Sequence, residues 1–201
     1  MDDKKIHIVY DKNIAKKIKK TKGAYKETVD AKITLPSVKI VTGMKEAVKR
    51  SDAATFDKSG FTLEKNEKEN GGGFREAGIT WDKEGNVKVE PDGSYADPRK
   101  EGASMIITPN TEGSGHVHSS GVITKTERVI KKDAAGIPRT GTSRTRYYIK
   151  NIPSPADYKS AARGTNIMIG GYGKTRTATF YNKKGVLATM KYKHFKKLEG
   201  K

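Results

Sequence analysis

The stretch Gly113-Ser114-Gly115-His116-Val117-His118 holds two of the four histidines of this 201-residue chain. Side chains on an extended segment alternate between its two faces, so His116 and His118 point the same way. Two imidazoles about 6–7 Å apart along a backbone can converge on one metal ion. A carboxylate from another segment would supply a third ligand and leave a position for water, as in catalytic zinc sites. The alternative is a pair of exposed histidines in a loop rich in Gly and Ser.

The sequence Ser154-Pro155-Ala156-Asp157 is typical of a helix start, with Ser at the N-cap, Pro at the first helical position and an acidic group at N3. It predicts a short helix that runs to about Arg163. An ordinary cap would explain Asp157 through the helix dipole alone. A carboxylate held at N3 is also rigidly aimed, and the Ser154 hydroxyl beside it can donate a hydrogen bond to an oxyanion. Asp157 is therefore the candidate third ligand.

A hydrolytic metal site also needs a general base. The candidates form one group of acidic residues on the N-terminal side of the histidines: Glu64, Glu67, Glu69 and Glu76. Most of them must be solvated surface charges. Glu69 stands two residues before the glycine run 71–73 and at the entrance to a predicted strand, so it is the preferred candidate.

The composition is basic and modestly apolar: 33% of residues are hydrophobic, 32% are charged and the net charge is +18. The excess lies at both ends, with net +8 over residues 1–50 and +9 over residues 151–201, whereas residues 51–100 carry net −3. This charge favours an anionic partner such as nucleic acid, an acidic protein or an anionic membrane surface. We expect a basic N-terminal extension or linker over residues 1–40, then one domain over residues 41–201.

The chain has no cysteine, which excludes disulfides, thiolate zinc sites and zinc deaminases that need thiolate ligands. No apolar run approaches the roughly 20 residues that span a bilayer, and the N-terminus leads into no signal-peptide core. Export would therefore need another route, such as fusion to a secreted carrier.

Alternation and turn signals predict the regular elements. A helix is expected over 43–54, and strands over 6–10, 74–81, 87–89, 103–108, 144–150, 166–170, 175–181 and 186–192. A turn at 82–86 and another at 182–185 predict two hairpins. The polar stretch 122–143 carries no clear signal.

Taken together, Glu69, His116-Val117-His118 and Ser154-Pro155-Ala156-Asp157 resemble the signature of the JAB/MPN (JAMM) metalloprotease family: a Glu, then H-x-H, then S-x-x-D. The resemblance covers roughly residues 66–195 and is closest to bacterial JAB-like toxin domains at the C-termini of secreted polymorphic toxins. It implies an α+β, cytidine-deaminase-like fold with a mixed central sheet flanked by helices.

The resemblance also implies a zinc-dependent peptidase or isopeptidase. His116, His118 and Asp157 would hold Zn²⁺, Glu69 would transfer the proton from water to the leaving amine, and Ser154 would stabilise the tetrahedral intermediate. The implied partners are a protein or peptide substrate and an acidic immunity or inhibitor protein. The implied setting is a bacterial effector delivered as part of a larger carrier.

Two features depart from the family pattern. The segment 119–153, 35 residues long, is far longer than the usual gap and implies an insertion at about 119–150, acting as a flap or substrate clamp. The surroundings of Glu69 match the family loosely, which leaves Glu76 as the second candidate base. Two other functions stay open: a non-catalytic basic module that binds nucleic acid or an acidic protein on an inactive JAB-like scaffold, and a metal-dependent nuclease toxin.

Overall fold

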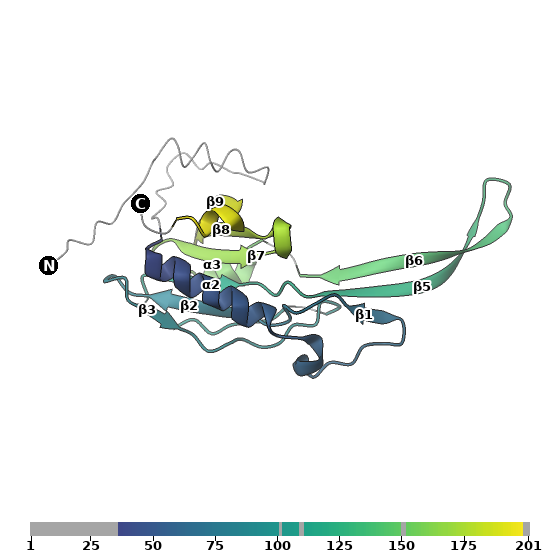
Figure 1. Ribbon diagram of the computed structural model, residues 1–201. Coiled ribbons are helices and arrows are strands. Elements are labelled where there is room, and N and C mark those ends of the chain that lie inside the picture. Colours follow the sequence, from purple (N-terminus) through teal and green to yellow (C-terminus); the bar gives the residue numbers. More distant parts are fainter. Residues whose placement is uncertain (1–35, 101, 109–110, 150–151, 199–201) are drawn as a thin grey trace.

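The computed structural model describes residues 36–100, 102–108, 111–149 and 152–198, and contains two β-sheets and few helices (Figure 1). The strands are β1 (Glu67–Glu69), β2 (Ala77–Trp81), β3 (Val87–Val89), β4 (Gly113–Val117), β5 (Val122–Lys132), β6 (Pro138–Tyr148), β7 (Asn166–Gly170), β8 (Thr177–Asn182) and β9 (Gly185–Lys191). The helices are α2 (Val38–Asp52), α3 (Pro155–Ser160) and α4 (Tyr192–Phe195), with 3₁₀ turns at Phe56–Ser59 and Gly173–Thr175. Among the described residues, no helix is both long and apolar enough to cross a membrane.

The central sheet has six strands in the order β3-β2-β4-β7-β8-β9. Strands β4 and β7 pair in parallel, and every other neighbouring pair is antiparallel. Strand β7 is buried along its whole length, as expected for a strand covered on both faces. The prediction of an α+β fold with a mixed central sheet is confirmed at this level.

Helix α2 covers one face of this sheet (Figure 1). The Ser37 hydroxyl caps its N-terminus by accepting a hydrogen bond from the Ile40 N–H at 3.4 Å. Its buried side chains recur at helical spacing and join the main core: Ile40, Val41, Met44, Ala47 and Val48. Phe195 of α4 is also fully buried in this core.

The glycines of β4 let α2 and its neighbours approach the strand closely. A Cβ on Gly115 would overlap the Met44 sulfur, and a Cβ on Gly113 would overlap the Trp81 ring. Both glycines share the α2 face with Val117, so the alternation along β4 turns Ser114 and His116 to the opposite face.

The opposite face is covered by α3. A second buried cluster there contains Ala161, Met168 and Tyr181, with Tyr158 packed against it. The ring of His116 lies against Tyr181 on this face, with ring centroids 6.3 Å apart and nearly perpendicular. The central strands therefore place His116 between the sheet and α3.

The second sheet has the order β1-β5-β6 and is dominated by a long hairpin. Strands β5 and β6 pair without a break from Val122↔Tyr148 to Lys132↔Pro138. Ile123 anchors the base of the hairpin in an aromatic cluster with Phe56 and Phe74. The rest extends away from the six-stranded sheet (Figure 1).

Several element predictions are confirmed and others are wrong. Strand β7 has the predicted bounds, and both predicted hairpins form, β2–β3 and β8–β9. The prediction of a strand over 103–108 is wrong, because the whole of this segment is irregular. The polar stretch 122–143 is instead β5 and half of β6. The helix predicted over 43–54 is α2, which begins earlier, at Val38, and ends at Asp52, and the strand predicted over 6–10 lies outside the described residues.

Candidate metal centre

The two histidines of the H-x-H motif lie at the end of β4 and are buried. His116 is 2% exposed and pairs with Gly78 of β2 and Met168 of β7. His118 follows the strand, is 5% exposed, and its backbone N–H donates to the Ile169 carbonyl at 2.8 Å. This bond keeps the chain extended through His118, so both rings project to the α3 face, with centroids 5.0 Å apart.

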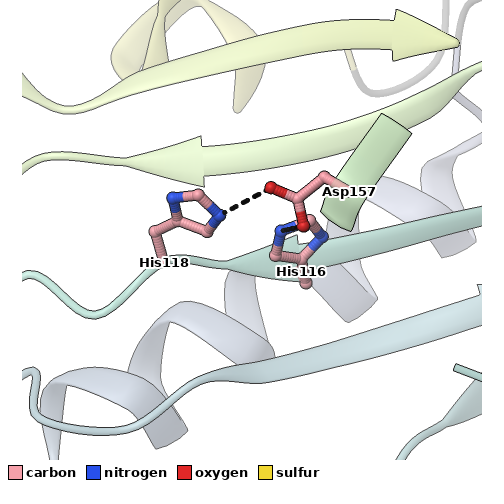
Figure 2. Close-up of side chains that lie close together, drawn as sticks. All are labelled: His116, His118 and Asp157. Atoms are coloured by element: carbon pink, nitrogen blue, oxygen red, sulfur yellow. Dashed lines mark hydrogen bonds and ion pairs between the residues drawn. The ribbon is translucent and has the colours of Figure 1, made fainter. Parts of the chain in front are cut away.

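Asp157 reaches the histidines from the first turn of α3. Its backbone N–H donates to the Ser154 hydroxyl at 3.2 Å, and its carboxylate accepts the Ser154 N–H at 2.5 Å. This reciprocal capping box, with Pro155 at the start of the helix, fixes the side chain. Figure 2 shows the carboxylate placed between the two imidazoles.

The distances fit a metal site. Asp157 Oδ1 lies 3.2 Å from His116 Nε2, and Asp157 Oδ2 lies 3.2 Å from His118 Nε2. One ligand atom from each of the three residues lies within 4.8 Å of the other two. In a tetrahedral zinc site with bonds of about 2.0–2.1 Å, neighbouring ligand atoms are about 3.3 Å apart. The buried His116, His118 and Asp157 group can therefore hold a metal ion.

The surroundings of the His116 ring nitrogens also fit a metal-ligand role. Both of its ring nitrogens are buried and lack a hydrogen bond of good geometry to a described residue, and Nε2 has only the 3.2 Å ion-pair contact with Asp157. A buried polar atom without a partner is costly and calls for an explanation. A metal ion would give one of these nitrogens a partner, which is why the donor set fits a ligand role.

The electrostatics favour the protonation state that binds a cation. Burial raises the pKa of Asp157, but hydrogen bonds from His116 and His118, the charge of His116 and the hydrogen bond from the Ser154 N–H outweigh it and hold the pKa well below its usual range. Asp157 is therefore a carboxylate at neutral pH, as a metal ligand must be.

A cavity of about 180 Å³ opens beside the three candidate ligands. Ser154 and Glu76 line it, and Met105 and Ile149 contribute apolar wall. Glu76 is 8% exposed, and its carboxylate makes no hydrogen bond or ion pair with a described residue. Burial raises the pKa of Glu76, the charge of Asp157 adds to the shift, and the two histidines oppose it.

Glu69 lies elsewhere. It ends β1, pairs with Ile123 of β5, and its carboxylate accepts the Phe56 N–H at 3.0 Å. It does not line the cavity that holds the two histidines and Asp157. Of the two glutamates that the sequence analysis weighed as general base, the structure brings Glu76 to the cavity.

Met105 and Ile149 were not among the predicted site residues. Met105 lies in the segment wrongly predicted as a strand, and Ile149 follows β6. An apolar residue that lines a cavity has the same sequence pattern as one that fills a core, so only the fold reveals these two.

Comparison with known proteins finds no family model, no curated protein and no solved structure that matches this chain.

Proposed function

We propose that this chain is a zinc-dependent peptidase or isopeptidase of the JAB/MPN type, with His116, His118 and Asp157 as its metal ligands. The observation that carries the proposal is the convergence of two buried histidines and the half-buried Asp157 beside a cavity that is also lined by a buried carboxylate, Glu76. Three protein ligands and an open side are the arrangement of catalytic zinc sites.

Each element of amide hydrolysis has a residue to supply it. A zinc ion bound here would polarise the substrate carbonyl and lower the pKa of water. Glu76 would accept the proton from the attacking water and deliver it to the leaving amine, since its buried carboxylate lines the same cavity as the three candidate ligands. We therefore assign the base role to Glu76 in place of Glu69.

Ser154 is suited to stabilise the oxyanion. Its oxygen accepts the Asp157 N–H, so the hydroxyl hydrogen remains available to donate. Because Ser154 also lines the cavity, that donor lies beside the space a substrate carbonyl would occupy.

The assignment to the JAB/MPN family rests on the order Glu, H-x-H, S-x-x-D and on the mixed sheet, in which His116 lies on β4 and Glu76 directly precedes the neighbouring strand β2. The H-x-H segment ends a central strand, and S-x-x-D opens a helix, as the family pattern requires. The β5–β6 hairpin between them is this chain's own addition. Delivery as a toxin or effector module rests on the sequence resemblance alone.

The proposal is tested by comparing Glu76→Gln with the matched control Glu69→Gln in zinc-loaded protein. The assay follows cleavage of peptides and of lysine isopeptide conjugates, with zinc content measured in parallel. We expect Glu76→Gln to lose about 10²–10⁴-fold in rate, the usual contribution of general acid–base catalysis, with zinc retained. Glu69→Gln should keep nearly full activity.

Full activity in Glu76→Gln, or a comparable loss in Glu69→Gln, would reject this base assignment. A parent protein that binds one zinc and cleaves none of these substrates would instead support the inactive-scaffold alternative.

A further inference from the structure

The β5–β6 hairpin presents two different faces because its residues alternate along both strands. Residues directly opposite in the register share a face. One face carries four cations, Arg128 and Lys132 from β5 and Arg144 and Arg146 from β6. Each of the three arginines lies opposite a threonine: Arg128 opposite Thr142, Arg144 opposite Thr126 and Arg146 opposite Thr124. Lys132 lies opposite Pro138. We call this face the arginine face. The other carries Lys125, Glu127, Lys131 and Arg139, and we call it the ion-paired face.

The charges on the two faces are arranged differently. On the ion-paired face, Lys125 contacts Glu64 at 3.3 Å and Glu127 at 3.0 Å, and Arg139 contacts Asp133 at 3.1 Å. On the arginine face the four cations are exposed and make no ion pair with a described residue. Lys68 of β1 joins this face opposite Thr124, and no acidic residue of the three strands lies on it.

An exposed array of cations without acidic neighbours favours an anionic partner. The array follows a two-stranded ribbon that extends away from the body of the molecule (Figure 1). Alternate residues of a strand are about 6.8 Å apart, which is about the axial distance spanned by two phosphate steps of one DNA strand. The major groove of DNA, about 12 Å wide, admits a two-stranded β-ribbon.

The scarcity of large apolar side chains on the arginine face favours nucleic acid over an acidic protein as its partner. Its large apolar side chains are confined to Ile130 near the tip, Tyr148 at the base and the half-buried Val122 opposite Tyr148, with threonines and cations between. Protein interfaces need an apolar core, whereas nucleic-acid interfaces are more polar and far more positive. We propose that the arginine face of the β5–β6 hairpin binds the phosphate backbone of nucleic acid. This inference is independent of the peptidase proposal.

The test measures binding of a short labelled DNA duplex to the full chain between about 50 and 200 mM salt. One triple variant replaces Arg128, Arg144 and Arg146 with Ala. The matched control replaces Lys125, Lys131 and Arg139 with Ala, and so removes an equal number of positive charges from the other face of the same hairpin. The logarithm of the binding constant falls linearly with the logarithm of the salt concentration, and losing three phosphate contacts makes this slope shallower by about 2.7. Raising the salt from about 50 to 200 mM should therefore weaken binding by the arginine-face variant by a factor about 40-fold smaller than the factor for the parent.

We expect the arginine-face variant to bind more weakly at low salt with this flatter slope, and the control to stay within about one unit of the parental slope. Equal effects of both variants would overturn the proposal, because net charge alone would then explain binding. Binding to polyglutamate with none to the duplex would overturn it in favour of an acidic protein. Thermal unfolding of all three proteins, together with a single Arg144→Glu variant that should also weaken binding, guards against a folding artefact.

Discussion

The substitution Asp157→Asn separates the proposed metal-ligand role of this side chain from its role in the helix cap. Asn keeps an oxygen that accepts the Ser154 N–H, so α3 should still begin at the same place. It removes the negative charge that lies 3.2 Å from Nε2 of both histidines. We expect about one zinc per parental chain and much less in the variant, because a neutral amide is a poor zinc ligand.

The size of the effect follows from linkage. Zinc at about 100 times its dissociation constant stabilises the folded state by about 2.7 kcal/mol, which raises Tm by about 5–11 °C in a domain of this size. If the variant binds zinc about a hundredfold more weakly, the same zinc concentration contributes only about 0.4 kcal/mol. The zinc-induced rise in Tm should then shrink to about 1–2 °C.

The assay combines metal content by mass spectrometry with thermal unfolding at several zinc concentrations, on protein purified without an affinity tag or chelator. The same rise in Tm for parent and Asp157→Asn would refute the reasoning, since zinc would then bind elsewhere. Absence of zinc from the parent, even after addition, would sink the hydrolase proposal as well.

Three other substitutions test the surrounding structure. Ser154→Ala removes the cap hydroxyl and should cost about 1 kcal/mol of stability in urea unfolding while zinc content stays at the parental level; loss of zinc would show that the cap also builds the site. Gly115→Ala places a Cβ against Met44 and should cost about 1–3 kcal/mol, whereas Gly102→Ala, with open space around its Cβ, should be nearly neutral; similar values for both would contradict the close approach of α2 to β4. Asp97→Asn breaks the 2.7 Å pair with Arg99 and should cost about 1–3 kcal/mol at pH 7. The Arg99 hydrogen bonds outweigh burial and hold the pKa of Asp97 below its usual range, so its stabilisation is present above about pH 3.9 and is lost as pH falls through the folded pKa. The gap between parent and variant should therefore close in acid, and a gap independent of pH would contradict this account.

The central sheet was largely predictable because local signals there agree with the fold. Strand β7 is a short apolar run next to turn residues, and β8–β9 has a turn between two alternating segments. Both follow from patterning alone. The segment 103–108 has the same apolar character, yet it is irregular because Met105 and Ile107 line the cavity instead of pairing in a sheet. Composition cannot separate these two uses of apolar residues.

Most of the β5–β6 hairpin was missed for the opposite reason, although the strand predicted over 144–150 overlaps the end of β6. Beyond Ile123 neither of its faces is buried, so its strands lack the apolar alternation that marks a half-buried strand. Its stability comes from backbone pairing and from a tight turn, where the Asp133 carboxylate accepts the N–H groups of Ala135 and Ile137. Only the turn carries a local signal.

The convergence of the three candidate metal ligands was predictable from local geometry, whereas the position of the glutamate depends on the register of the sheet. Period two orients His116 with His118, and a capped helix aims Asp157, so both parts follow from short stretches. The choice between Glu69 and Glu76 depends instead on which strand lies beside β4. Strand β2 pairs with β4 from Ala77↔Val117 to Trp81↔Gly113.

Continuing that register by one residue sets Glu76 opposite His118. Because Ala77 and Val117 lie on the α2 face, Glu76 falls on the other face with both histidines. Gly78, opposite His116, leaves room on that face, and Met105 fills it, since a Cβ on Gly78 would overlap the Met105 side chain. A shift of one residue in the β2–β4 pairing would turn Glu76 to the α2 face, so the same register that builds the core also supplies the carboxylate of the site.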